Sequence, residues 1–229
     1  MATPYVTILR NVVPSTQELA VEEMRARRRP ALVVAQNQTA GRGRSGNEWW
    51  QAPRATAPSL AFPGDTFDVD ETFPLAVGLA VHQAIAEVLT VQVVLKWPND
   101  LEHLGKKIGG ILVERDEQRI VVGCGLNLYW PDPPATAGAL FADDPGPHVG
   151  EEVARLWATQ ILATAGFWDR DAYLEACSML GTVVSWVPDG RGVVETVDDR
   201  GGLVVATAAG SVTLRSGEVR RVRLLSDDA

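Results

Sequence analysis

Residues 96–114 form the stretch KWPNDLEHLGKKIGGILVE. Its first five residues follow an apolar run, so they stand at the end of a predicted strand, where Pro-Asn-Asp would also make an ordinary turn. A lysine, an amide and a carboxylate gathered there can hold a phosphate and a magnesium ion. The next predicted strand, residues 108–114, contains two adjacent glycines. Such glycines often mark a bulge or the close approach of a ligand.

Further elements are predicted on both sides of this stretch. Strands over 92–96 and 119–128, separated from residues 108–114 by short polar turns, are typical of a mixed or antiparallel sheet with helices on one side. Upstream we expect a capped helix beginning near Ser15, a buried strand over 31–35, an irregular segment over 36–46 and a helix over 75–89. Downstream we expect a proline-rich loop over 129–150, followed by helices over 151–165 and 169–180.

The pattern of residue types in the sequence changes after residue 180. Short Val- and Leu-rich runs then alternate with Asp/Gly turns, which is typical of a small barrel. The predicted fold class is therefore α+β, a sheet flanked by helices, with one domain over 1–180 and a barrel over 181–229.

Composition narrows the class of protein. The 229 residues are 46% hydrophobic and 22% charged, as in a soluble globular protein, and the net charge of −8 argues against general attraction to DNA or to an anionic membrane. Positive charge for an anionic ligand must then gather locally, in one pocket. Cys124 and Cys177 lie in apolar surroundings, which indicates buried thiols in a reducing compartment. Neither a signal peptide nor a membrane-spanning run is present, so we expect a cytoplasmic protein.

A second motif, GRGRSG over 41–46, matches the G-x-G-x-x-G pattern of dinucleotide-binding folds. That pattern requires a helix to begin at its third glycine, whereas NEWWQAP follows here and does not open one. Two interpretations stay open. The loop is either a solvated turn or a site where two arginines meet carboxylate and phosphate. A third motif, GCGLN over 123–127, places two glycines in another predicted strand, just before the amide side chain of Asn127.

Together, GRGR, KWPND, KIGGILVE and GCGLN, in this order and at these separations, resemble the biotin protein ligases, also called biotin-[acetyl-CoA-carboxylase] ligases. The resemblance extends over nearly the whole chain. It implies a catalytic fold similar to that of class II aminoacyl-tRNA synthetases, with a small SH3-like barrel at the C-terminus. It also implies the activity, in which biotin and ATP form biotinyl-5′-AMP with release of pyrophosphate. The biotinyl group then passes to a lysine of a biotin carboxyl carrier protein domain.

The resemblance also implies the site residues. Biotin would contact Ser15, Thr16, Gln17, Gln38, Gly41, Arg42, Gly43, Arg44, Lys107 and Gly110. ATP and the adenylate would contact Arg42, Arg44, Trp49, Lys96, Asn99, Asp100, Lys107 and Asn127. Lys107 and Arg42 would be the catalytic residues, and Asp100 is a candidate for acting through Mg²⁺. Trp49 would pack on the adenine and Asn127 would face the nucleotide.

Some features depart from the family pattern or leave alternatives open. Gln17 stands where Asn is frequent, and residues 47–48 and 54–58 also differ, while Ser15 serves equally well as a helix cap. A lipoyl or octanoyl ligase of related fold and a non-catalytic biotin-binding regulator are the alternative functions. Some relatives carry an N-terminal DNA-binding domain, but only 14 residues precede Ser15, so we expect no DNA binding. The sequence leaves open whether a homodimer forms and which carboxylase is modified.

Overall fold

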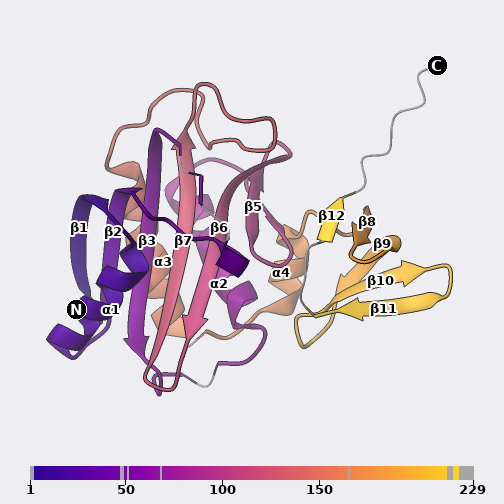
Figure 1. Cartoon of the computed structure of the whole chain (residues 1–229), viewed down its shortest axis with the longest axis horizontal. Coiled ribbons are helices and arrows are strands. Elements are labelled where there is room, and N and C mark those ends of the chain that lie inside the picture. Colours follow the sequence, from indigo (N-terminus) through magenta and orange to yellow (C-terminus); the bar gives the residue numbers. More distant parts are fainter. Residues whose placement is uncertain are drawn as a thin grey trace.

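The computed structural model describes residues 3–46, 49–50, 52–67, 69–164, 166–215 and 219–221. A seven-stranded sheet forms the larger part of the molecule (Figure 1), in the order β1-β2-β3-β7-β6-β5-β4. Its strands are Val6–Val13 (β1), Ala31–Gln38 (β2), Arg54–Pro63 (β3), Val94–Lys96 (β4), Asp100–His103 (β5), Lys106–Arg115 (β6) and Arg119–Tyr129 (β7). Strands β1 and β2 are parallel and the other neighbours are antiparallel, so the sheet is mixed.

Helices cover both faces of this sheet, and the expectation of helices on one side is wrong. Helix α1 (Thr16–Arg27) packs on one face through a cluster that includes Ala20, Val33 and Ala61. Helices α2 (Phe73–Val88), α3 (Val149–Thr164) and α4 (Arg170–Ala176) contribute to the larger core on the other face. The reason lies in β2, where the first five residues are all buried. A strand that is apolar on both faces needs cover on both.

Two strands extend beyond what local patterns indicate. Strand β2 runs on through Gln38, because residues 31–38 pair in parallel with β1 up to Val13, so the first part of the segment predicted to be irregular is strand. Strand β3 crosses the middle of the sheet although it contains Pro58. Proline cannot donate to a ladder, and the pairing of β3 with β7 is interrupted between Thr56 and Ser59.

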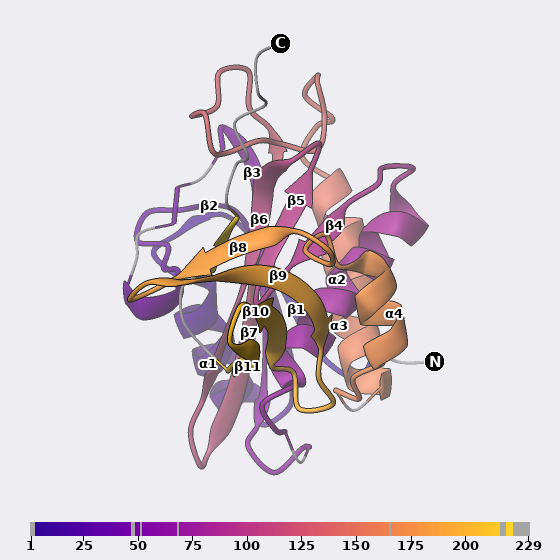
Figure 2. The same ribbon diagram turned by 90° about the vertical axis from the view of Figure 1, so that its right-hand side faces the viewer.

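A second sheet lies at the C-terminal end of the chain, beside α4 (Figures 1 and 2). It is antiparallel, in the order β11-β10-β9-β8-β12. Its strands are Val183–Trp186 (β8), Gly190–Val197 (β9), Leu203–Thr207 (β10), Gly210–Leu214 (β11) and Val219–Arg221 (β12). This arrangement fits the small barrel-like unit predicted here. Residues 216–218 and 222–229 of that unit lie outside the described residues, and the boundary at 180/181 stays a prediction.

Two remaining expectations concern the cysteines and the membrane. Cys124 and Cys177 form no disulfide bond; Cys124 is buried as expected, whereas Cys177 is only partly buried. Within the described ranges, no helix combines the length and the apolar character needed to cross a membrane.

Candidate active site

The first part of the site is a buried polar cluster where α1 begins. Ser15 caps the helix, and its Oγ accepts a hydrogen bond from the backbone N–H of Glu18 at 3.5 Å. The backbone N–H and the hydroxyl of Thr16 both donate to Gln38 Oε1, at 2.8 and 3.0 Å. The Thr16 hydroxyl also lies 2.8 Å from the Ser59 hydroxyl on β3. Ser59 was not among the predicted residues, because a lone serine in an apolar run carries no signal in the sequence.

Gln17 lies on the same side of the sheet, over the glycine-thinned part of β7. Its Nε2 donates to the carbonyl of Leu112 on β6 at 3.3 Å. A Cβ atom built on Gly123 would lie 3.2 Å from Gln17 Cδ and equally close to Ser59 Oγ. Gly123 therefore leaves room for Gln17, which is 6% exposed.

Trp49 connects the GRGR loop with the two glycine-containing strands. Its backbone N–H donates to the carbonyl of Gly41 at 3.2 Å. Its indole lies against β7 and β6, since a Cβ atom on Gly125 would be 2.6 Å from the ring and one on Gly110 would be 3.5 Å away. Lys107 Nζ is 5.9 Å from the ring centroid. The absence of a side chain at Gly110 and Gly125 thus makes space for the indole of Trp49.

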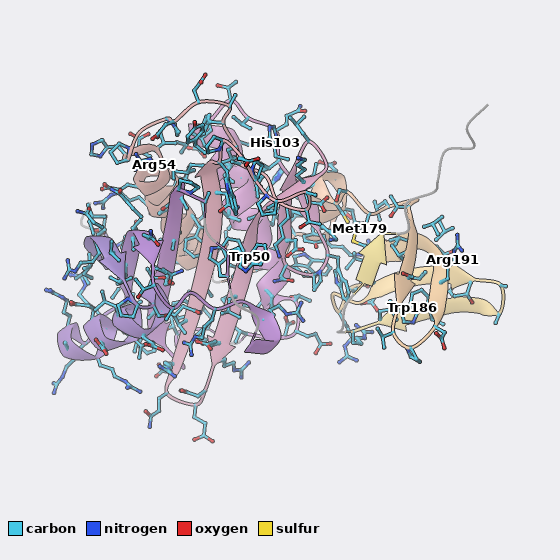
Figure 3. The ribbon with its side chains drawn as sticks, turned by 45° about the horizontal axis from the view of Figure 1, so that its top comes forward. Trp50, Arg54, His103, Met179, Trp186 and Arg191 are labelled. Atoms are coloured by element: carbon cyan, nitrogen blue, oxygen red, sulfur yellow. The ribbon has the colours of Figure 1, made fainter. Side chains whose placement is uncertain are left out.

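The exposed face of the site carries the next residue of the loop. Trp50 is 63% exposed and lies over the larger sheet (Figure 3). The same figure shows Met179, Trp186 and Arg191 away from this face, with the C-terminal sheet.

The predicted lysines share one carboxylate. Asp100 Oδ1 is 2.5 Å from Lys107 Nζ, and Asp100 Oδ2 is 3.7 Å from Lys96 Nζ. Lys96 also pairs with Glu102 at 3.8 Å. The register of the sheet accounts for the contact of Lys96, which pairs with Asp100 across β4 and β5. Lys107 pairs with Glu102 across β5 and β6, where the register shifts between Leu101 and Glu102.

The two arginines of the GRGR motif, which flank Gly43, point to different partners. Arg44 donates to Asn99 Oδ1 at 3.0 Å, and Asn99 in turn donates to the carbonyl of Ile111 at 2.9 Å. Arg42 pairs instead with Glu18 on α1 at 3.2 Å and with Glu114 on β6 at 3.9 Å. Arg44 is therefore joined to the KWPND segment, and Arg42 is turned toward α1 and the far end of β6.

Asn127 holds two loops together. It is 3% exposed, its Oδ1 accepts from the backbone N–H of Ala52 and its Nδ2 donates to the carbonyl of Gly138, both at 3.2 Å. The backbone N–H of Gly138 donates to the carbonyl of Lys107 at 2.8 Å. One amide side chain thereby links the end of the GRGR loop, through Gly138, to Lys107.

Hydrogen bonds from Arg54 also hold the proline-rich segment that contains Gly138. Arg54 Nε and Nη2 each donate to the carboxylate of Asp144 at 2.9 Å, and Arg54 Nη1 donates to Gln36 at 3.3 Å. The hydrogen bond from Arg54 holds the pKa of Asp144 below its usual value. Both residues are close to solvent, so this pair positions the segment more than it stabilises the fold.

The donor set around Asp100 does not fit a resident Mg²⁺ ion. Magnesium requires an octahedral shell of oxygen ligands, whereas this carboxylate already lies between the ammonium groups of Lys96 and Lys107. Among the described residues, no group of three or more His, Cys, Asp and Glu side chains is arranged to hold a metal.

The profile of the biotin/lipoate A/B protein ligase family matches residues 9–127, just over half of the chain. The chain belongs to this family. A biotin--[acetyl-CoA-carboxylase] ligase of Paracoccus denitrificans is 31% identical over 216 residues, covering 82% of this chain and 89% of that protein. One of Mycobacterium tuberculosis is 30% identical over 213 residues, covering 84% and 79%.

Solved structures of biotin/lipoate ligase family members agree with the fold. The biotin protein ligase of Aquifex aeolicus, in complex with biotin and ATP, superposes with a TM-score of 0.79 at 26% identity, covering 95% of this chain and 99% of that chain. The α+β class and the family predicted from the motifs are confirmed.

Proposed function

We propose that this chain is an ATP-dependent biotin protein ligase of the biotin-[acetyl-CoA-carboxylase] type. The observation that carries the proposal is the match to the Paracoccus denitrificans ligase, at 31% identity over 82% of this chain. The family profile covers both biotin and lipoate ligases, but both relatives compared above are named as biotin ligases. A lipoyl or octanoyl ligase is therefore the less favoured alternative.

The reaction has two steps. A carboxylate oxygen of biotin attacks the α-phosphorus of ATP, the bond to pyrophosphate breaks, and biotinyl-5′-AMP forms. The ε-amino group of an acceptor lysine then attacks the biotinyl carbonyl carbon, AMP leaves, and an amide bond forms with loss of the amine proton to solvent. Since both nucleophiles belong to substrates, the protein acts by positioning and by stabilising charge.

We assign biotin to the polar cluster formed by Thr16, Gln17 and Gln38, beside the Trp49 ring, on which we propose that the adenine packs. A few directed polar groups in a mostly apolar slot are what a compact urea ring requires. The glycines at 110 and 123 support this assignment, because each leaves space beside Trp49 or Gln17.

We assign the triphosphate to the other end of the site, near Arg44, Lys96 and Asn99. Lys107 would stabilise the charge that builds on the α-phosphate, and its pairing with Asp100 fixes the position of the ammonium group. Arg42 pairs with Glu18 and Glu114. Its catalytic role therefore requires the half-exposed side chain to turn from these carboxylates toward the substrates.

The acceptor that we propose is a lysine of a biotin carboxyl carrier protein domain, in the cytoplasm. The absence of DNA binding is a prediction with a direct test, since a gel shift should show no sequence-specific complex. A homodimer is left open by the sequence, and sedimentation measures whether one forms.

The test of the function is biotin-dependent exchange of labelled pyrophosphate into ATP. The wild type should catalyse exchange. The exchange rate of Lys107→Ala should be lower by at least about 100-fold, as for removal of one preorganised donor. Lys106→Ala is the matched control. Lys106 is an exposed lysine next to Lys107 on the same strand, so this variant should keep the wild-type exchange rate. Exchange with lipoate but not biotin would move the assignment to the alternative. Exchange with neither would refute it.

A further inference from the structure

We propose that Trp97 is a positioning residue for the nucleotide-binding segment, acting through a hydrogen bond to a backbone carbonyl in a turn of the C-terminal unit. The inference rests on the function proposed above. Trp97 is 2% exposed, and its indole Nε1 donates to the carbonyl of Gly201 at 2.9 Å. Gly201 lies in the turn between β9 and β10, 104 positions further along the chain.

The local geometry makes Trp97 control the residues next to it. Lys96 on β4 pairs with Asp100 on β5, so residues 97–99 form a three-residue hairpin loop. The loop also contains Asn99, which accepts a hydrogen bond from Arg44 and is bonded to Ile111 through both side chain and backbone. A shift of the indole must therefore move groups that we assign to ATP.

The turn that offers the carbonyl is held firmly. Asp198 Oδ1 accepts from the backbone N–H groups of Arg200 and Gly202, at 3.0 and 2.8 Å, and the Gly201 N–H donates to the Asp198 carbonyl at 2.9 Å. Arg215 donates to both oxygens of the Asp198 carboxylate. Gly201 has φ +77°, a conformation that favours glycine. The acceptor for Trp97 is thus held in place by contacts within its own turn.

A second contact fastens the same segment from the same side. The carbonyl of Leu95 accepts from the backbone N–H of Ser178 at 2.8 Å and from its hydroxyl at 3.1 Å. Residues beyond α4 therefore hold β4 at Leu95 and the loop at Trp97. The biotin cluster of Thr16, Gln17 and Gln38 is built from α1 and β2, and these contacts do not touch it.

This separation predicts a selective kinetic effect. Without the bond from Trp97, the loop would hold Lys96 and Asn99 less well, and ATP would bind more weakly. The net value of a buried hydrogen bond corresponds to about a three- to tenfold change. We expect a rise of that size in the KM for ATP, with the KM for biotin unchanged.

The chain offers a matched control for this test. Trp157 is fully buried, and its Nε1 donates to the carbonyl of Val77 at 3.3 Å, between α3 and α2. Trp97→Phe and Trp157→Phe each remove one buried indole donor and keep an aromatic ring. Both should lower the unfolding midpoint by similar amounts, but only Trp97→Phe should raise the KM for ATP in the exchange assay.

Gly201→Ala provides a second route to the same bond without changing Trp97. A Cβ atom here is strained at φ +77° and would lie 3.0 Å from a methyl group of Leu75, so we expect the turn and its carbonyl to shift. The variant should show the same ATP-selective effect. If both variants have the kinetic constants of Trp157→Phe, or if the KM values for biotin and ATP rise together, the inference is wrong. If the wild type itself fails to exchange, the proposed function fails instead.

Discussion

Asn127 gives the sharpest test of how the site is held together. Replacing it with Ala removes both of its hydrogen bonds and leaves the Ala52 N–H and the Gly138 carbonyl without their partner. Asn127 is 3% exposed and Ala52 is 2% exposed, so water cannot easily replace the lost hydrogen bonds. Each buried group left unpaired costs about 1–3 kcal/mol. We expect Asn127→Ala to lower the free energy of unfolding by about 3 kcal/mol.

The same change should slow the reaction beyond its effect on stability. Gly138 holds the backbone of Lys107, and Ala52 ends the loop that carries Trp49, so both would lose a common anchor. Asn127→Asp separates the two contacts, because a carboxylate still accepts from Ala52 but repels the Gly138 carbonyl. We expect this variant to keep the loop in place while disturbing Lys107.

The assay combines urea unfolding with pyrophosphate exchange, measured at several concentrations of biotin and of ATP under conditions where each variant is folded. The expected result for Asn127→Ala is a fall in kcat that exceeds any change in KM. Unchanged stability together with a rise in the KM for ATP alone would refute this reasoning. Asn127 would then be the nucleotide contact that the family resemblance implies.

Three further outcomes follow from the structure. Gly125→Ala places a methyl group 2.6 Å from the Trp49 ring and should displace it, so exchange should fall by at least about tenfold, in line with the cost of overpacking. Burial lowers the pKa of His82, so the unfolded chain binds its proton more tightly; stability should fall as the pH drops below about 6.5, and His82→Gln should flatten that slope in urea titrations. Burial raises the pKa of Cys124 to about 12, so iodoacetamide at mildly alkaline pH should modify only Cys177 quickly in the folded protein, and mass spectrometry showing two fast modifications would contradict this.

Local sequence signals predicted those elements whose cause is local. The cap at Ser15 acts within four residues, and α1 begins directly after it. Strands β6 and β7 are rich in β-branched and aliphatic residues and lie within two residues of their predicted ends. The helix predicted over 75–89 is observed as Phe73–Val88 for the same reason, a periodic apolar face.

The rest depended on contacts between distant segments. Strand β3 contains two prolines and a polar start, and it is a strand because β2 and β7 pair with it from either side. Nothing near Gly125 in the sequence indicates that Trp49 lies on it, since 76 positions separate the two. The partners Ser59 and Gly201 were missed likewise, because a hydroxyl in an apolar strand and a glycine in a turn have many possible explanations.

In this acidic chain, the cationic side chains proposed to bind the triphosphate are already paired with carboxylates of the same chain. Lys96 and Lys107 flank Asp100, and Arg42 lies between Glu18 and Glu114, so the predicted concentration of positive charge is balanced internally. Asp100 reduces the repulsion between the two ammonium groups and keeps both near the place where phosphate is to arrive. Each ammonium group has three N–H donors. Lys96 and Lys107 can therefore bind phosphate oxygens while they still hold Asp100.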